Sequence, residues 1–312
     1  MNAVAITGHG SHLPRRRIGN DQLSLERPLT EEQLERIGIR SRYWAEPDEG
    51  IVEMAAAAAG QALGRAGQSA SALDLIILSN WTQRRYIPDL APRLKHRLGA
   101  QQAFALDIGC ACAGFLVGLA TARALLADTG RRTALVVASE TTSQRARPGG
   151  RSTLLYSDGA GAFVLDAAPH ATSRLIDCEL VTHSEHHDLM DVTAEGHVRS
   201  RVAQRDLVAL AVGSIVDTAA VLLERNSLTL RDIDWLIPHS GSAGIQALLR
   251  ERLGDAADRV LTNLPLVGNL SSASIPQAVD HFVTQGTIRP GQLILAVSVG
   301  TGFYATAALF TL

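Results

Sequence analysis

Residues 106–130, LDIGCACAGFLVGLATARALLADTG, decide the fold prediction because they join a strand to a helix through a cysteine. The apolar run up to Ile108 predicts a strand, and the run 114–130 predicts a helix that Gly130 ends. The small residues between them allow a tight turn from which a side chain projects. A cysteine at such a helix N-terminus lies near unpaired N–H groups and the positive end of the helix dipole. Both lower the pKa of a thiol, and the same N–H groups can hold an oxyanion.

Two interpretations of Cys112 remain open on this stretch alone. It is either a nucleophile or a small core residue, the role of most unpaired cysteines. Cys110 lies further into the strand end and is predicted to be structural. With Cys178 the chain has three cysteines, a sparse and odd number that argues against a disulfide framework and for a reducing compartment. The Cys-Ala-Cys spacing is too short for the usual zinc pattern.

The bulk composition excludes several classes of protein. The chain has 312 residues, of which 46% are hydrophobic and only 4% aromatic, so aliphatic side chains and alanine must fill its core. A formal charge of −2 gives no sign of a nucleic-acid binder. No apolar run approaches a membrane span, and the N-terminus lacks the pattern of a secretory signal. We therefore expect a cytoplasmic protein that binds neither membrane nor nucleic acid.

Apolar strand-like runs alternate with helical runs along the chain, which predicts an α/β fold with buried, mostly parallel strands. One internal echo indicates a duplication. In the segments that start at Val52 and Val212, a helix leads through a polar link to an aspartate and then to an apolar strand. Asp74 and Asp234 stand at matched distances within these segments.

The duplication divides the chain into two halves. Proline and small polar residues cluster at 166–174, which places the boundary so that the halves span 1–168 and 169–312. The segment 182–205 is polar, rich in His and Arg, and without clear periodicity. It is predicted to be a loop or a surface excursion.

Two side chains of the second half are candidate partners for the thiol. His239 ends the apolar run DWLIPHS, and Asn269 lies in the glycine-flanked turn of GNLSSASIP. A lone histidine at a strand end is usually structural. Here the strand echoes one of the first half, and strand ends of both halves converge on one cleft in a duplicated fold. This places His239 near Cys112.

At these motifs the chain resembles the beta-ketoacyl-ACP synthase III family, which has the thiolase fold. The motifs are DIGCACAGF around Cys112, SDGAGAFVL from Ser157, the His239 and Asn269 motifs, and the terminal SVGTGFYATAALF. They occur in the family's order and spacing, and the similarity runs from residue 2 to the end. The glycines of SDGAGAF precede a strand rather than a helix, so we expect a structural turn and no dinucleotide.

The resemblance implies a five-layer αβαβα fold, a homodimer and a two-step reaction without a cofactor. In the family, the cysteine takes an acyl group from acyl-CoA, and the His and Asn bind the thioester carbonyl of a malonyl carrier protein. Loss of carbon dioxide then leaves a carbanion that attacks the acyl-cysteine. By position, the backbone N–H groups of Cys112 and Thr301 form the oxyanion hole. The substrate-binding positions are Ile87, Arg151, Leu207 and Ser242.

The donor and acceptor contacts depart from the family pattern. The tryptophan that stacks on adenine is Glu32 here, or Gln33 if a gap is allowed, whereas Arg151 is retained. Two basic carrier-protein positions are Gly244 and Val208. Two arginines at one helix end either replace them or form a solvated face: Arg250 and Arg252. Tyr86 and Ile87 lie where the partner subunit closes the acyl pocket, beside Arg84 and Arg85, which pair with a polar acyl chain or are surface charges.

These features leave three functions open. The first is a condensing enzyme, specialised for a starter unit of secondary metabolism. The second is an acyltransferase that uses His239 as a base toward a hydroxyl, an amine or another carrier. The third is a silent partner subunit, which the retained cysteine disfavours. The histidines of 183–188 offer two or three metal ligands on a predicted loop with no matching partner, so no metal site is expected.

Overall fold

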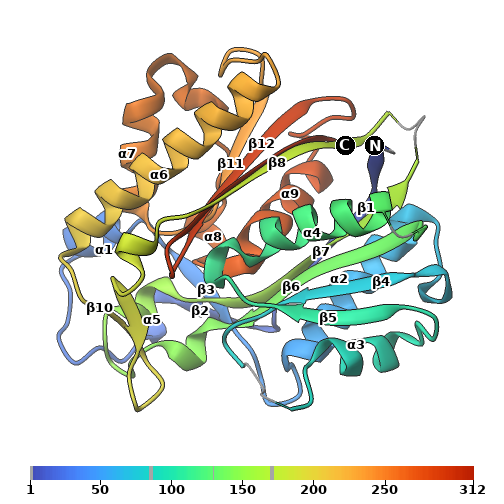
Figure 1. The fold of residues 1–312 in the computed structure, drawn as a ribbon. Helices are drawn as coiled ribbons and strands as arrows, with labels where there is room; N and C mark the ends of the chain where they lie inside the picture. The colour runs from blue at the N-terminus through green and yellow to red at the C-terminus, as the bar shows by residue number, and fades with distance from the viewer. Residues whose placement is uncertain (1–2, 84–86, 129, 169–171) are drawn as a thin grey trace.

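The computed structural model describes residues 3–83, 87–128, 130–168 and 172–312 (Figure 1). Its main feature is a nine-stranded mixed sheet. The strands lie across it in the order β11 (Trp235–Pro238), β12 (Leu293–Gly300), β13 (Tyr304–Thr311), β8 (Arg174–Thr182), β1 (Val4–His12), β7 (Asp158–Ala167), β6 (Thr133–Thr141), β4 (Leu75–Ser79) and β5 (Phe104–Ile108).

The sheet has two parts with matching strand directions. In the first, β4 runs parallel to β6, and β7 runs antiparallel to both β6 and β1. In the second, β11 runs parallel to β12, and β13 runs antiparallel to both β12 and β8. Among the described residues, one strand pair, Val4↔Leu175, joins the two parts, between β1 and β8. The division at 168 stays a prediction, since strand directions alone do not define independent units.

The helices pack against the sheet in three layers. The helices are α1 (Glu31–Ile37), α2 (Ile51–Ala66), α3 (Ala91–Leu98), α4 (Gly114–Asp128), α5 (Ser152–Leu155), α6 (Gln204–Arg225), α7 (Ala243–Leu253), α8 (Leu264–Val267) and α9 (Ser274–Thr284). Figure 1 shows α4 and α9 between the two parts of the sheet. Both contact strands of each part, with α4 on β6 and β8 and α9 on β7 and β11.

Three apolar clusters correspond to these layers. The central one joins α4 and α9 to both parts of the sheet and includes Phe115, Phe163 and Phe310. A second packs α2 and α3 on the outer face of the first part, and a third packs α6 and α7 on that of the second. Helix, sheet, helix, sheet and helix therefore form five layers, which confirms the predicted fold class.

α6 contradicts the expectation that no apolar run of the chain approaches the length of a membrane span. It is long and apolar enough to cross a membrane by length and composition. However, Val212, Ile215 and Leu222 on this helix pack in the outer cluster against β12 and β13, which explains its apolar character without a lipid environment.

The polar segment 182–205 holds more structure than a loop. β9 (Met190–Val192) and β10 (Val198–Ser200) pair in an antiparallel hairpin. Gly196 reverses the chain at φ 87°, a conformation that glycine adopts without strain. The hairpin was missed because each of its strands is three residues long, too short to show a period, and none of their residues is buried. A second small sheet pairs β2 (Arg16–Gly19) with β3 (Ser41–Trp44).

Candidate active site

The turn that carries Cys112 connects β5 to α4 through a single 3-10 turn, Ala111–Ala113. Cys110 and Ala111 have φ values of 67° and 47°, which few residues other than glycine adopt. The turn also lies tightly against its neighbours, because a Cβ at Gly114 would stand 2.2 Å from Ser79 Oγ. The predicted strand-to-helix turn is thus confirmed, and local strain of this kind is typical of functional sites.

The Cys112 thiol faces the second half of the chain. Its Sγ accepts a hydrogen bond from Ser271 Oγ at 3.2 Å, and its carbonyl oxygen accepts one from Ser298 Oγ at 2.9 Å. Ser271 belongs to the turn that follows Asn269, and Ser298 belongs to β12. Two elements far away in the sequence therefore fix the position of the cysteine.

The pKa of Cys112 differs from the sequence expectation. Burial raises this pKa to about 12, the negative charge of Glu140 adds to the rise, and the hydrogen bond from Ser271 opposes it. The amides of the turn are also partly engaged, since the Ala113 N–H donates to the Cys110 carbonyl at 3.0 Å. The prediction that this pKa is lowered is therefore wrong, because burial raises it by more than the hydrogen bonds to the sulfur lower it.

His239 follows the end of β11 and is only 6% exposed. Its backbone N–H donates to the Val297 carbonyl at 2.7 Å, which extends the β11–β12 pairing by one residue. Burial lowers the pKa of the imidazole to about 4, partly offset by a hydrogen bond with the Ser271 backbone. His239 is consequently neutral near pH 7, and its buried Nδ1 has no hydrogen-bond partner among the residues that the structure describes.

Asn269 links the histidine loop to the cysteine turn. Its Nδ2 donates to the Gly241 carbonyl at 2.9 Å, and its Oδ1 accepts from the Ser271 N–H at 2.8 Å. An amide NH₂ has two hydrogens, so one donor is left after the bond to Gly241. Since Ser271 also contacts Cys112 Sγ, the structure brings together the three residues that the sequence singled out.

The predicted oxyanion-hole segment packs directly on the cysteine turn. A Cβ at Gly300 would lie 2.4 Å from the Cys110 carbonyl oxygen and 3.1 Å from the Cys112 nitrogen. Only glycine permits this approach, which brings the following residue, Thr301, beside the turn. Thr301 Oγ1 also contacts Met190 Sδ of the β9–β10 hairpin at 3.8 Å. The assignment of the Cys112 and Thr301 N–H groups to an oxyanion hole stays a prediction.

The predicted substrate-binding residues lie at the surface or at helix starts. Ile87 is 91% exposed, Arg151 is exposed before α5, and Leu207 is half-buried in the first turn of α6. Ser242 caps α7 by accepting the Ile245 N–H at 3.4 Å. Among the described contacts, none joins these residues to Cys112. Three neighbours of Ile87 lie outside the described residues: Arg84, Arg85 and Tyr86.

Helix α1 explains the residues at the expected adenine position. Gln33 and Thr30 form a reciprocal cap, with Gln33 Oε1 accepting the Thr30 N–H at 3.1 Å. Glu32 is exposed in the first helical turn, where a negative charge is favourable. Both residues thus stabilise the start of the helix rather than offer a stacking surface.

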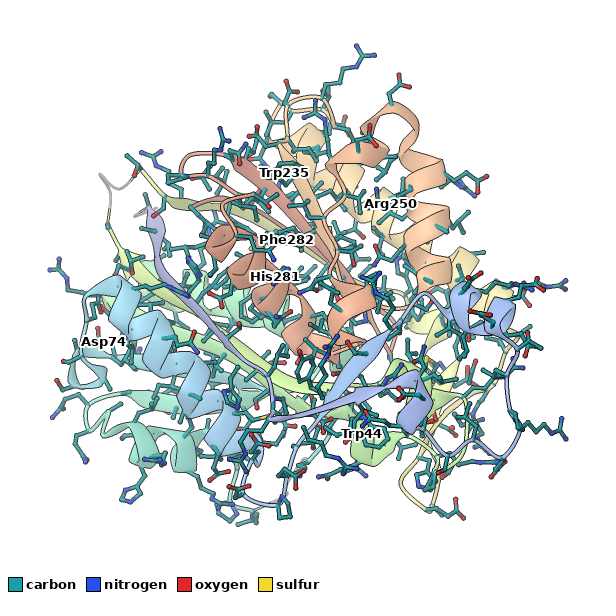
Figure 2. The ribbon with its side chains drawn as sticks, turned by 180° about the vertical axis from the view of Figure 1, so that it is seen from behind. Trp44, Asp74, Trp235, Arg250, His281 and Phe282 are labelled. Carbon is teal, nitrogen blue, oxygen red and sulfur yellow. The ribbon has the colours of Figure 1, made fainter. Side chains whose placement is uncertain are left out.

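Arg250 and Arg252, which either replace the basic carrier-protein patch or form a solvated helix face, differ in their contacts. Arg250 donates from Nη1 to the Ala257 carbonyl at 2.6 Å and from Nη2 to the Val260 carbonyl at 2.7 Å, so it holds the segment after α7 (Figure 2). Arg252 is exposed. Gly244 and Val208 face each other between α7 and α6, with 3.6 Å from Val208 Cγ2 to a Cβ at Gly244.

Three residues of the site were missed by the sequence analysis. Ser271 stands two positions after Asn269 in an already quoted motif, and its φ of 53° is visible only in the structure. Glu140 is fully buried at the end of β6, and a charge that ends an all-apolar run was the available signal. Trp81 follows β4, and its indole N–H donates to Ser271 Oγ at 2.7 Å. No pattern in the sequence indicated that contact.

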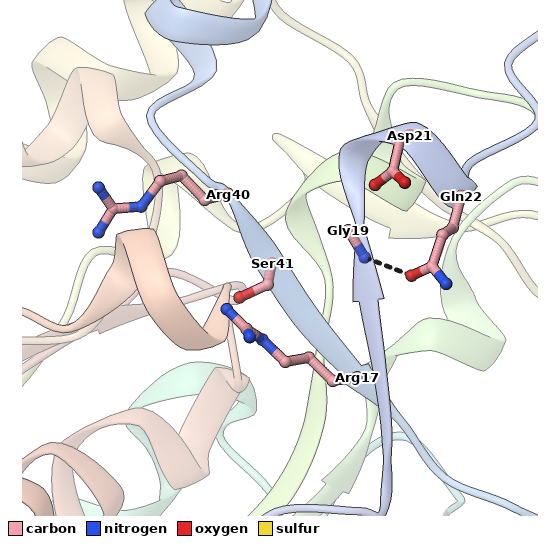
Figure 3. A pocket seen from close by; sticks show the side chains of 6 residues that line it. All are labelled: Arg17, Gly19, Asp21, Gln22, Arg40 and Ser41. Atoms are coloured by element: carbon pink, nitrogen blue, oxygen red, sulfur yellow. Dashed lines mark hydrogen bonds between the residues drawn. The ribbon is translucent and has the colours of Figure 1, made fainter.

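The structure also locates a hollow away from Cys112. It measures about 380 Å³ and lies on the β2–β3 sheet, lined by Arg17, Gly19, Asp21, Gln22, Arg40 and Ser41 (Figure 3). In the part of the chain that the structure describes, no group of three or more His, Cys, Asp or Glu side chains is arranged to hold a metal ion.

Comparisons with known proteins agree with this geometry. Residues 106–184 match the family model of 3-oxoacyl-[acyl-carrier-protein] synthase III, and residues 223–312 match the model of its C-terminal part. A beta-ketoacyl-[acyl-carrier-protein] synthase III of Erythrobacter litoralis is 34% identical, covering 99% of both chains. Another of that name, numbered 3, from Streptomyces coelicolor is 35% identical, covering 99% of this chain and 97% of the relative.

Solved structures give the same result. The 3-oxoacyl-[acyl-carrier-protein] synthase III of Aquifex aeolicus superposes with a TM-score of 0.93 at 30% identity, covering 99% of this chain and 100% of the other. The priming beta-ketosynthase of the R1128 polyketide pathway superposes with a TM-score of 0.91 at 30% identity, covering 100% and 96%. The chain therefore belongs to the beta-ketoacyl-[acyl-carrier-protein] synthase III family of acyltransferases.

Proposed function

We propose that this enzyme forms a carbon–carbon bond in two steps. In the first, Cys112 Sγ attacks the carbonyl carbon of an acyl thioester, an acyl-cysteine forms, and the donor thiol leaves with the proton of the cysteine. In the second, a malonyl thioester loses carbon dioxide. The electron pair of the broken bond attacks the acyl-cysteine carbonyl, which releases a 3-ketoacyl thioester and the Cys112 thiolate, and the thiolate takes a proton from water.

The observation that carries this proposal is that two neutral side chains, those of His239 and Asn269, are both hydrogen-bonded to Ser271, which contacts the Cys112 sulfur. Decarboxylation places negative charge on the thioester oxygen, and neutral N–H groups at fixed positions stabilise it without a proton transfer. Asn269 offers one remaining N–H, and its other contacts hold it rigidly to Gly241 and Ser271. His239 is neutral because burial lowers its pKa to about 4.

The alternative is acyl transfer to a hydroxyl, an amine or a carrier without condensation. In that reaction His239 acts as the general base. A base is most effective with a pKa near the working pH, and a pKa of about 4 makes His239 a weak one. What favours the alternative is the altered donor and acceptor surface, where Glu32 replaces an aromatic residue and Arg250 is engaged with backbone carbonyls.

A specialised role in supplying a starter unit fits the same departures. The likeness to the priming beta-ketosynthase of the R1128 polyketide pathway, at 30% identity, supports this choice. The substrates in this proposal are acyl-CoA or an acyl carrier protein as donor and a malonyl carrier protein as acceptor. The enzyme works in the cytoplasm and needs no cofactor.

We further propose a homodimer. Ile87 is 91% exposed, more than any other large hydrophobic side chain in the part of the chain that the structure describes, and it lies in the segment predicted to reach the partner's acyl pocket. A silent partner subunit remains the third possibility. The retained Cys112, with a hydrogen bond already directed at its sulfur, argues against it.

A paired assay tests the proposal. The enzyme is loaded from a panel of acyl-CoAs and acyl carrier proteins, and the mass added at Cys112 is measured. A malonyl carrier protein is then added, and carbon dioxide release is followed. An adduct followed by carbon dioxide and a 3-ketoacyl product supports condensation. An adduct that alcohols or amines discharge without carbon dioxide release overturns condensation in favour of plain acyl transfer.

A further inference from the structure

Ser271 is the point at which the contacts of the site meet. Its Oγ contacts Cys112 Sγ, its N–H donates to Asn269 Oδ1, and its backbone is hydrogen-bonded with His239. Its φ of 53° places it among the few described non-glycine residues with a left-handed backbone, two others of which are Cys110 and Ala111. Such strain persists only where the surrounding structure imposes it.

Trp81 determines which way the Ser271 hydroxyl points. An indole N–H can only donate, so at 2.7 Å from Trp81 Nε1 the Ser271 oxygen must act as acceptor. The single hydroxyl hydrogen is then left for Cys112 Sγ at 3.2 Å. The serine is thereby held as a donor to the sulfur.

Trp81 is itself fixed at its backbone. Its N–H lies 3.3 Å from Glu140 Oε2, which also accepts from the Thr82 hydroxyl at 2.8 Å. The other carboxylate oxygen accepts from Ser272 Oγ at 2.6 Å. Glu140 thus ties the loop after β4 to the turn that holds Ser271, and the indole cannot turn away without breaking its bond to that serine.

We propose that Trp81 and Ser271 form a hydrogen-bond relay that directs a fixed donor at the Cys112 sulfur and stabilises its thiolate. Ser271 contacts the reacting atom and acts catalytically, whereas Trp81 acts through Ser271 as a positioning residue. The inference rests on the proposed function only in taking Cys112 as the nucleophile. The relay offsets part of the cost of ionising a buried thiol.

The other titratable groups at the thiol are few among the described residues. Glu140 lies on β6, Tyr156 lies between α5 and β7, and His239 follows β11. Tyr156 is neutral across the accessible range, because burial raises its pKa further above the usual value. His239 stays neutral above about pH 5. Glu140 is therefore the group whose charge must be kept constant, by working at or above pH 8.

Alkylation of the free enzyme by iodoacetamide tests the relay without any acyl substrate. The thiolate displaces iodide and forms a sulfur–carbon bond, so the rate follows the thiolate population. The rate is measured at several pH values from 8 upward, with the adduct located on the Cys112 peptide by mass. In Ser271→Ala we expect the rate at pH 8 to fall about tenfold. In Trp81→Phe, which keeps a ring but loses the N–H, we expect a fall of about two- to threefold.

Non-additivity separates a relay from two independent contacts. The double variant of Trp81→Phe and Ser271→Ala should react no more slowly than Ser271→Ala alone, because the indole acts only through the serine. A further fall in the double variant contradicts the relay. A wild-type rate in either single variant also overturns it, and if Ser271→Ala fails to fold, the Trp81→Phe rate decides.

Two matched controls keep the result specific. Ser298→Ala removes a serine bond to the Cys112 carbonyl but none to its sulfur, and Trp235→Phe removes an indole bond to Gln292. Figure 2 shows Trp235 remote from the lower part of the molecule, where Trp44 lies. Trp235→Phe should react within about twofold of wild type, and the rate of Ser298→Ala should fall less than that of Ser271→Ala, because the hydrogen bond to the sulfur is kept. If Ser298→Ala falls as far as Ser271→Ala, the effect comes from displacement of Cys112, and the relay is rejected. A wild-type enzyme that is alkylated at Cys112 but releases no carbon dioxide from a malonyl thioester would instead count against the proposed condensation.

Discussion

β6 and β12 occupy matching places in the two parts of the sheet, yet the residues at their ends near the active site differ in chemical character. The Asp74 N–H donates to the Thr133 carbonyl, and the Asp234 N–H donates to the Leu293 carbonyl, each at 2.9 Å. Seven residues on from these carbonyls, β6 presents Glu140 and β12 presents Gly300. One strand end carries a buried carboxyl group, and the other carries no side chain at all.

The same asymmetry holds one strand further out. β4 pairs with β6 from Leu75, and β11 pairs with β12 from Trp235, so Ser79 corresponds to His239. Ser79 packs beneath the cysteine turn with its hydroxyl unpartnered, whereas His239 carries an imidazole. The two parts of the sheet thus share the same backbone arrangement. The side chains at matching positions differ, and these differences determine the chemistry around Cys112.

Removing the thiol between the two strand ends should have the largest effect. Cys112→Ala should give no acyl adduct on incubation with acyl thioesters, because the nucleophile is absent. Intact-protein mass measures the adduct, and Cys178→Ala, which changes a cysteine of β8, should retain it. An adduct that persists in Cys112→Ala would show that the nucleophile lies elsewhere.

Changing the donor that the second half supplies should separate the two steps. Asn269→Ala should lower condensation about 10²- to 10³-fold, as expected for one lost oxyanion donor, while leaving most of the acylation. Asn269→Asp keeps an acceptor for the Ser271 N–H but loses the donor, so it should lose condensation as Asn269→Ala does.

Single-turnover acylation and carbon dioxide release measure the two steps separately. Equal losses in both steps for both variants would mean that Asn269 holds the turn together and does not act on the substrate.

Glu140→Gln makes the β6 end as uncharged as the β12 end. Burial raises the pKa of Glu140 to about 7, above the unfolded value of 4.5. The folded state therefore binds more protons than the unfolded state between these values, and stability is lost as the pH rises from about 4.5 through 7. The loss approaches ~3 kcal/mol.

The unfolding free energy of Glu140→Gln lacks this pH dependence. The amount by which the variant is less stable than wild type should therefore shrink between pH 5 and pH 8. Denaturant unfolding across that range measures the difference, and two parallel pH curves would show that Glu140 does not titrate there. Because the Glu140 charge raises the pKa of Cys112, the variant should also be alkylated faster at pH 8.

Gly300→Ala tests the end of β12, where glycine has no side chain. The new methyl group would stand 2.4 Å from the Cys110 carbonyl oxygen, so the cysteine turn must shift. We expect a loss of about 1–3 kcal/mol in unfolding free energy together with slower acylation. Gly213→Ala, in α6, is the matched control because nothing lies within 4 Å of its added Cβ. Equal stability in the two variants would contradict the close packing described for β12.

Much of the site follows from local sequence. The small residues around Cys112 dictated a strand-to-helix turn, and the spacing from Val52 to Asp74 and from Val212 to Asp234 indicated paired strands with converging ends. The strand-end position of His239 and the glycine-flanked turn of Asn269 singled out the partners of the thiol, and the family motifs agreed. The hairpin within 182–205 escaped prediction because strands of three residues are too short to show a period.

The sequence by itself determined the layered α/β class, the turn at Cys112 and the residue types brought to it, because each depends on neighbours within a few positions along the chain. Only the tertiary structure decided the state of those residues. Burial sets the pKa of Cys112, His239 and Glu140 in directions that local sequence does not predict. The contact of Trp81 with Ser271 joins residues 190 positions apart, and such a contact exists only once both parts of the sheet have packed around α4 and α9.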